Sequence, residues 1–189
     1  MAITINGSGT VTGISVGGLP DGIVDTDMLA SSVALGITEV DMWRVHTTWQ
    51  GGANPITSNW ERFDSNGEGK LGTGMTESSG VFSFPSTGFW QIDYHSNFYS
   101  GTDYGNVIIY LKTSIDSGSN YTYNSDGYSD VYFDSGNGYQ SADASVILDV
   151  TNTSTFKVTF GVSDKANVYF VGNSGQNQTY AIFTKLAET

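Results

Sequence analysis

Few residues of this 189-residue chain have the types and spacing that catalysis or metal binding requires. The chain has no cysteine, which excludes thiolate catalysis and zinc bound by cysteine. Its two histidines, His46 and His95, could bind zinc only with a carboxylate from a distant segment, and no spacing indicates one. Nineteen acidic residues offer many carboxylate pairs for glycoside cleavage, but no motif selects a pair. We therefore predict a protein that is not an enzyme, with a weak glycosidase as an alternative.

Three short segments match the residue patterns of functional motifs but lack the structural context that those motifs need. Gly13–Gly17 spells a hydrolase nucleophile elbow, which needs a strand-to-helix turn that a glycine-rich segment does not supply. Gly67–Gly72 spells a dinucleotide-binding loop, but no helical pattern follows it, and Glu68 would repel a pyrophosphate. Residues 64–69 begin like an EF-hand calcium loop, yet its twelfth position is Met75 instead of glutamate. None of the three motifs predicts an activity.

Tyrosines gather in one stretch of the chain, where eight of the eleven fall between Tyr99 and Tyr139 among Ser, Gly, Asn and Asp. Such a mixture is typical of binding surfaces, because tyrosine offers a large contact area at low entropic cost and small polar residues adapt their hydrogen bonds. Tyrosine rings beside carboxylates also suit sugars. The candidate contacts to a ligand or receptor are Tyr121, Tyr123, Asp126, Tyr128, Asp130 and Tyr139. The alternative is a solvated strand–loop–strand whose aromatic residues pair across strands.

No cofactor is expected, apart from a structural calcium ion in the same stretch. Asp126, Asp130 and Asp134 could hold calcium together with backbone carbonyls, which are the ligands that this ion prefers. Spacing alone does not choose between a bound ion and none.

The charge of the chain excludes several classes of partner. With 7 basic and 19 acidic residues, the formal net charge is −12. This argues against binding nucleic acid or an anionic membrane surface, since both need clustered Lys and Arg. No apolar run approaches the ~20 residues of a membrane span, so no membrane insertion is expected. The first residues show neither a basic head nor a long apolar stretch, so we expect no signal peptide and synthesis in the cytoplasm.

The amino-acid composition of the chain changes near residue 40. Residues 1–40 contain no aromatic residue, no Lys and no Arg. A segment with scattered aliphatic residues among glycines cannot build a core of its own. We predict an extended arm that becomes ordered against sister chains or a larger assembly, the alternative being an unstructured tail. The apolar residues that would anchor it are Ile3, Ile5, Val11, Ile14, Val16 and Leu19.

Residues 41–189 alternate apolar and polar residues with a period of two, which predicts strands with one buried and one polar face. No long helical pattern interrupts them. The expected strands include residues 41–49, 88–98, 107–115, 142–150, 156–162, 167–171 and 179–187. Eight to ten such strands indicate an all-β fold, an antiparallel sandwich or jelly roll.

Ser79–His95 resembles the central signature of the tumour-necrosis-factor and complement globular-head jelly rolls. A short strand ending in proline leads there into glycine, aromatic residues and alternating apolar residues. The signature positions are Gly88, Trp90, Ile92 and Tyr94, and Tyr180–Leu186 resembles the closing strand of that family. The resemblance covers about 130 residues. It implies a jelly-roll sandwich that forms a homotrimer.

One polar row follows from the same strand. Gln91, Asp93, His95 and Asn97 alternate with the signature residues, so they face away from the core. In the resembled family this strand lies in the sheet that faces the three-fold axis, which implies hydrogen bonds between subunits along this row. Three copies of Asp93 and His95 around a metal ion, or an ordinary solvated face, are the alternatives.

Gly9–Gly22 is similar to the opening of many tail-fibre and virion structural proteins of marine bacteriophages. This resemblance implies a protein of the particle surface, on the capsid or a tail fibre. Residues 1–40 would bind other virion proteins, and residues 41–189 would form a trimeric knob for adhesion to the host surface, with a glycan as one candidate receptor. The alternatives are a purely architectural capsid decoration protein and a carbohydrate-binding module.

Overall fold

The computed structural model describes residues 4–5, 11–12, 36–63 and 67–189. The chain divides into two units, residues 1–36 and residues 37–189. In the first unit, β1 (Thr4–Ile5) pairs antiparallel with β2 (Val11–Thr12), and Ile5 lies opposite Val11. The remaining predicted anchor residues lie outside the described residues: Ile3, Ile14, Val16 and Leu19.

The second unit begins four residues before the predicted boundary at residue 41. The Glu39 carboxylate accepts hydrogen bonds from the backbone N–H groups of Thr73 and Gly74, at 3.0 and 2.9 Å. The N–H of Val40 donates to the carbonyl of Leu71 at 3.1 Å. Residues 37–40 therefore belong to the β domain and not to the arm.

The described part of the second unit contains twelve strands and no helix. They are β3 (Val40–Val45), β4 (Thr47–Gln50), β5 (Trp60–Arg62), β6 (Thr76–Ser78), β7 (Val81–Ser83), β8 (Gly88–Ser100), β9 (Tyr104–Ser114), β10 (Thr122–Val131), β11 (Gly138–Val150), β12 (Lys157–Val162), β13 (Tyr169–Asn173) and β14 (Thr179–Ala187). A search of the described residues finds no helix long and apolar enough to span a membrane.

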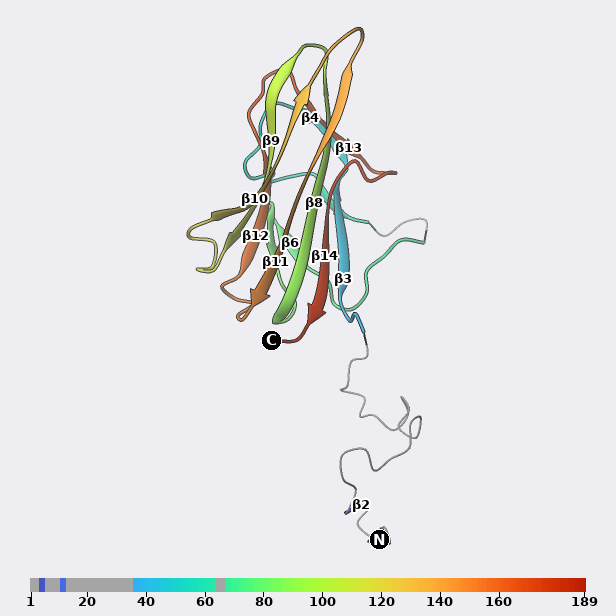
Figure 1. Ribbon diagram of the computed structural model, residues 1–189, viewed down its shortest axis with the longest axis vertical. Helices are drawn as coiled ribbons and strands as arrows, with labels where there is room; N and C mark the ends of the chain where they lie inside the picture. Colours follow the sequence, from blue (N-terminus) through green and yellow to red (C-terminus); the bar gives the residue numbers. More distant parts are fainter. Residues whose placement is uncertain (1–3, 6–10, 13–35, 64–66) are drawn as a thin grey trace. The chain divides into compact units, whose positions relative to one another are not determined.

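The strands form two antiparallel sheets, which confirms the predicted all-β sandwich. The smaller sheet has the order β10-β9-β12-β7-β6. The larger has the order β4-β13-β8-β14-β3-β5, and β11 pairs with β8 along the whole length of β8. Figure 1 shows β8, β14 and β3 running side by side along the domain. The edge strands of the two sheets, β10 and β11, lie against each other.

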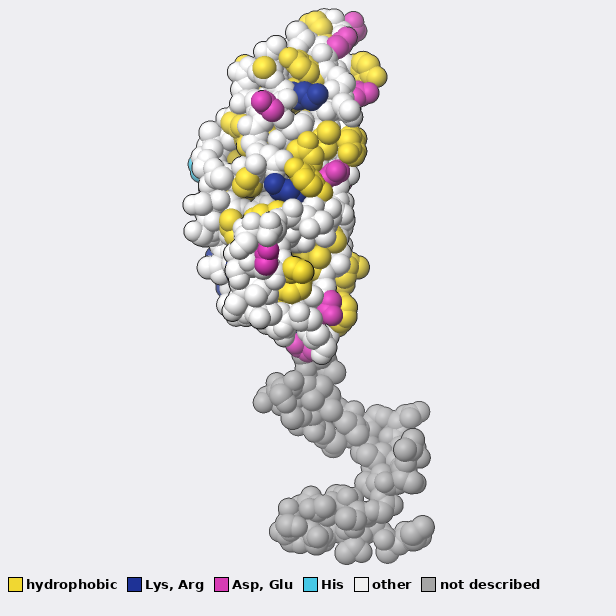
Figure 2. Space-filling view, turned by 90° about the vertical axis from the view of Figure 1, so that its left-hand side faces the viewer, with side chains coloured by type: hydrophobic (Ala, Val, Ile, Leu, Met, Phe, Trp, Pro, Cys, Tyr) yellow, Lys and Arg dark blue, Asp and Glu magenta, His cyan; other side chains and the backbone are white. Residues whose placement is uncertain are grey.

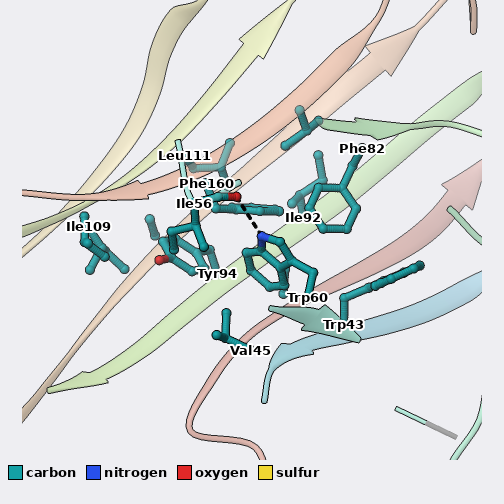
Figure 3. Close-up of a cluster of buried hydrophobic side chains, with 14 of the residues drawn as sticks. Trp43, Val45, Ile56, Trp60, Phe82, Ile92, Tyr94, Ile109, Leu111 and Phe160 are labelled. Carbon is teal, nitrogen blue, oxygen red and sulfur yellow. Dashed lines mark hydrogen bonds between the residues drawn. The ribbon is translucent and has the colours of Figure 1, made fainter. Parts of the chain in front are cut away.

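The core lies between the sheets and is rich in aromatic residues. The ring of Phe82 from β7 lies 5.2 Å from that of Trp60 and 5.6 Å from that of Trp43, measured between centroids. Figure 3 shows these rings packed with side chains of both sheets. The indole N–H of Trp60 donates to the carbonyl of Ile56 at 2.9 Å, which satisfies a polar group inside the core.

The alternation predicted for β8 is present. Trp90, Ile92 and Tyr94 are buried, while the residues between them are partly exposed on the outer side of the larger sheet. Fully burying such a side chain stabilises the fold by roughly 1.5–3 kcal/mol. Strand β9 differs from the predicted 107–115 at both ends, because it begins at Tyr104 and ends at Ser114, after which Ile115 is exposed.

Strand β10 differs most from the sequence prediction, because none of the expected strands covered residues 122–131. The side chains that β10 turns toward the sandwich are Ser125, Gly127 and Ser129, so the strand carries no apolar stripe until Val131. An edge strand pairs through its backbone on one side only and tolerates a polar exterior. Pairing with β9 forms β10 despite its composition.

Candidate interaction faces

The first candidate surface consists of the outward side chains of β8, β11 and β14, here called the β8 face. It contains the predicted polar row. His95 places Nδ1 2.6 Å from Asp143 Oδ1 on β11 and Nε2 2.9 Å from Asn97 Oδ1. The amide nitrogen of Asn97 donates to Gln178 Oε1 at 2.6 Å. The strand register explains the pairing, since Asp143 lies directly opposite His95.

Gln91 and Asp93, at the other end of the polar row, are also held by hydrogen bonds within the subunit. The Gln91 amide donates to Asp93 Oδ2 at 2.9 Å, and the Ser145 hydroxyl donates to Asp93 Oδ1 at 2.6 Å. All four predicted row residues thus lie on one face and have hydrogen-bond partners within the subunit. A polar group that already has its partners loses little when water is removed from around it.

Aromatic rings border the polar row. The ring of Tyr180 lies over that of His95 at 5.1 Å between centroids. Partial burial, followed by the charges of Asp143 and Asp93, raises the pKa of the Tyr180 hydroxyl. Tyr99 stacks on Tyr169 at 4.9 Å.

Large apolar side chains are exposed on the same face. Phe89 is 40 %, Ile147 60 % and Tyr139 65 % exposed. A hollow of about 480 Å³ lies beside Tyr139, next to Asn97 and Gln178. A sheet face that combines exposed apolar groups with satisfied polar groups is suited to contact with another protein surface.

The second candidate surface consists of the outward side chains of β9 and β10 together with Tyr121, here called the tyrosine face. Figure 2, which views the domain from the side of β10, shows hydrophobic side chains in patches, with acidic and basic side chains among them. Lys112 is 8 % exposed, and its Nζ lies 5.3 Å from the ring centroid of Tyr123 and 6.0 Å from that of Tyr121. Two tyrosine rings therefore cover this cation.

Tyr110 is the centre of the tyrosine face. Its ring meets that of Tyr123 edge to face at 5.3 Å between centroids. Partial burial, followed by the proximity of Tyr123, Asp126 and Tyr128, raises the pKa of the Tyr110 hydroxyl. The sequence prediction did not include Tyr110 or Lys112 among its contacts, although both alternate in phase along β9.

A hydrogen-bonded turn positions Tyr121 next to β10. The Ser114 hydroxyl donates to Asp116 Oδ1 at 2.6 Å, and the amide of Asn120 donates to Asp116 Oδ2 at 2.7 Å. These bonds, with that from Ser114 the strongest, lower the pKa of the Asp116 carboxyl to about 2. The turn thus keeps a charged carboxylate as its hydrogen-bond centre at neutral pH.

The structure separates the six predicted ligand contacts into two groups. Tyr121, Tyr123, Asp126, Tyr128 and Asp130 lie on or beside β10. Tyr139 lies on β11 and belongs to the β8 face, where its ring is 5.1 Å from that of Tyr99. No signal in the sequence distinguishes Tyr139 from the others, because the separation arises from the pairing of β11 with β8.

Two of the three predicted calcium ligands, Asp126 and Asp130, have hydrogen-bond partners in the fold. Asp130 Oδ1 accepts from the N–H of Asn106 at 2.6 Å, and Asp126 meets the Tyr128 hydroxyl at 3.5 Å. Within residues 36–63 and 67–189, no group of three or more His, Asp or Glu side chains is placed to hold a metal ion. No ligand cluster therefore supports the calcium prediction.

Comparisons with solved structures identify the fold. The chain is similar to murine APRIL at pH 5.0, with a TM-score of 0.58 and 11 % identity over 78 % of this chain and 98 % of that one. It is also similar to Eiger TNF from S. frugiperda, with a TM-score of 0.61 and 9 % identity over 82 % of this chain and 95 % of that one. No protein-family model and no curated protein sequence matches the chain. Its fold is a tumour-necrosis-factor-like jelly roll.

Proposed function

We propose that this jelly roll is the knob of a homotrimeric, non-enzymatic bacteriophage virion protein, and that its subunits associate through the β8 face. The fold and the resemblance of Gly9–Gly22 to phage fibre proteins support this proposal. Closed cyclic symmetry is the usual outcome when copies of one chain associate.

The composition of the β8 face carries the proposal. Association would bury Phe89, Ile147 and Tyr139, and fully burying a large apolar side chain contributes roughly 1.5–3 kcal/mol. The polar row beside them already has its hydrogen bonds, so its desolvation opposes association weakly. A solvated face with no partner would gain nothing from this arrangement of exposed apolar groups.

Residues 1–36 attach the knob to other virion proteins in this proposal. The segment offers aliphatic side chains and backbone pairing, as in the β1–β2 pair, and contains no aromatic residue that could form a separate core. Display on the particle surface then presents many knobs at once. Weak contacts repeated in this way raise the avidity for a host surface far above the affinity of one site.

The test is a charged substitution on the β8 face, followed by light scattering of the full chain. Ile147→Asp removes an apolar contact and places a charge in the interface, so we expect the association constant to fall by at least about tenfold. The matched control is Ile115→Asp, which changes a similarly exposed isoleucine after β9 and should leave the mass unchanged. An Ile147→Asp variant that associates as the wild type does would refute association through this face.

A further inference from the structure

The tyrosine face borders a cavity of about 300 Å³ on the outer side of the smaller sheet. Its wall is formed by Asn54, by Tyr110 from β9, and by Ser163 and Asp164 after β12. At this volume the cavity lies at the lower limit of small-molecule sites, ~300–1,000 Å³, and admits a single ring.

The segment before β5 builds one wall by pairing antiparallel with the end of β12. The N–H of Val162 donates to the carbonyl of Ala53 at 2.7 Å, and the N–H of Ala53 donates back to the carbonyl of Val162 at 3.3 Å, which fixes the pairing. Asn54 then lies directly on Gly161, where an added Cβ atom would come within 2.6 Å of Asn54 Oδ1. The glycine at position 161 therefore leaves the space that the Asn54 side chain fills against the sheet.

Hydrogen bonds hold the polar groups of the cavity in place. The Asn54 amide donates to the hydroxyl of Tyr123 at 3.3 Å, which joins the cavity to the tyrosine face. Asp164 Oδ1 accepts from the N–H of Gly52 at 3.1 Å, so the carboxylate is oriented while its side chain stays exposed. Orientation before binding lowers the entropic cost of recognition.

The rings beside the cavity provide an apolar platform. Tyr123 is 55 % and Tyr128 60 % exposed, although Tyr110 packs against the first of them. Exposed rings next to fixed carboxylate and amide groups match a ligand that has both C–H faces and hydroxyl groups. The rings would stack on the C–H faces, and Asp164 and Asn54 would bond the hydroxyls.

The charges at the site select against an anionic ligand. Asp164 lines the cavity and Asp126 lies across from Tyr110 in the strand register, so two carboxylates flank the platform. The basic side chain of Lys112 is buried beneath two rings and is not available to balance an anion. The whole chain also carries a net charge of −12.

We propose that this cavity, with Tyr110 and Tyr123 as its platform and Asn54 and Asp164 as its polar groups, binds a neutral saccharide unit. The inference deepens the adhesive part of the proposed function and rests on it for the biological role of the ligand. The site lies on the opposite sheet from the β8 face, so a trimer formed through that face would leave it open.

The test measures binding of neutral sugars to the full chain by saturation-transfer NMR and calorimetry. The probes are glucose, galactose, mannose and N-acetylglucosamine with their short oligomers, with sialyllactose as an anionic probe and choline as a cationic one. We expect at least one neutral sugar to bind and both charged probes to fail. Binding of choline or sialyllactose alone, or of no probe, would overturn the inference.

Substitutions test where the sugar binds, and they distinguish the contribution of the Tyr123 ring from that of its hydroxyl group. Tyr123→Ala should reduce affinity by about tenfold or more because the platform is lost. Tyr123→Phe keeps the ring, loses only the hydrogen bond that orients Asn54, and should reduce affinity less. Asp164→Asn should cost about tenfold, since a charge-assisted hydrogen bond becomes a neutral one. The matched controls are Tyr132→Ala and Asp149→Asn, which are exposed elsewhere. Equal losses in variants and controls would refute the site.

The same samples distinguish failure of this inference from failure of the proposed function. A trimeric mass without sugar binding rejects the saccharide site and favours an architectural knob. Site-dependent sugar binding by a chain of monomer mass, 20.2 kDa, supports the site and rejects the trimer.

Discussion

The β8 face and the tyrosine face lie on opposite sheets of one sandwich, and they satisfy their polar groups in different ways. On the β8 face, Asp93 accepts hydrogen bonds from Gln91 and Ser145, and Asp143 contacts His95, while apolar side chains of the same face are exposed. On the tyrosine face, Asp126 meets only a tyrosine hydroxyl at 3.5 Å, and the exposed surface is aromatic. The β8 face can therefore be buried against another protein at little polar cost. The tyrosine face keeps a carboxylate with free hydrogen-bonding capacity for a small polar ligand.

Both faces depend on the same core, so a substitution that destabilises the core should disrupt both of them. Phe82 is fully buried between the sheets, so Phe82→Ala should destabilise the domain by roughly 3–5 kcal/mol through lost burial and a residual cavity. Urea denaturation measures this loss. The matched control is Phe133→Ala, which shortens an exposed phenylalanine and should cost less than about 0.5 kcal/mol. Similar costs for the two variants would contradict the position assigned to the core.

Gly127 connects the two faces where β10 meets β11. A Cβ atom at this position would lie 2.4 Å from the backbone carbonyl oxygen of Asp143, whose side chain belongs to the β8 face. Gly127→Ala must therefore push the two edge strands apart, at a cost of roughly 1–3 kcal/mol. Hydrogen exchange should accelerate in β10 and β11 together.

Gly105 provides the control for this substitution. An added Cβ atom there has its closest neighbour at 3.7 Å, which is ordinary contact distance, so Gly105→Ala should leave exchange in both strands unchanged. Unchanged exchange in the Gly127→Ala variant would show that the edge strands are not in close contact.

The smallest expected effect is the protonation of Asp116 at low pH, which concerns the turn beside the tyrosine face alone. The pKa of Asp116 falls from its ordinary value of 3.8 to about 2 in the folded state. A lowered pKa means that the carboxylate contributes to stability above pH 3.8 and that this contribution is lost as the pH falls through about 2. NMR shifts of Asn120 should therefore titrate with a midpoint near pH 2. The change should be absent in Asp116→Asn, and a titration near pH 4 would contradict the prediction.

Much of the larger sheet could be predicted from the sequence. Buried and outward residues alternate along the whole of β8, and the buried ones include Trp90, Ile92, Tyr94 and Phe98. Strand β10 could not, since its inward residues are small and polar and its pairing with β9 decides its structure. The polar row was predictable from β8 itself, but its partners Asp143 and Ser145 come from a strand about 50 residues away. In the wall of the cavity, Gly52 donates a hydrogen bond to Asp164, which lies 112 residues further along the chain, and no local sequence pattern predicts such a contact.

The central claim is that the β8 face is buried on association while the tyrosine face stays open. Hydroxyl-radical footprinting of the full chain tests it directly, because Tyr139 and Tyr128 are 65 % and 60 % exposed in one subunit. We predict that Tyr139 is oxidised several times more slowly than Tyr128, and that Ile147→Asp restores its rate. Oxidation of Tyr139 as fast as that of Tyr128 in the wild-type chain would contradict the account.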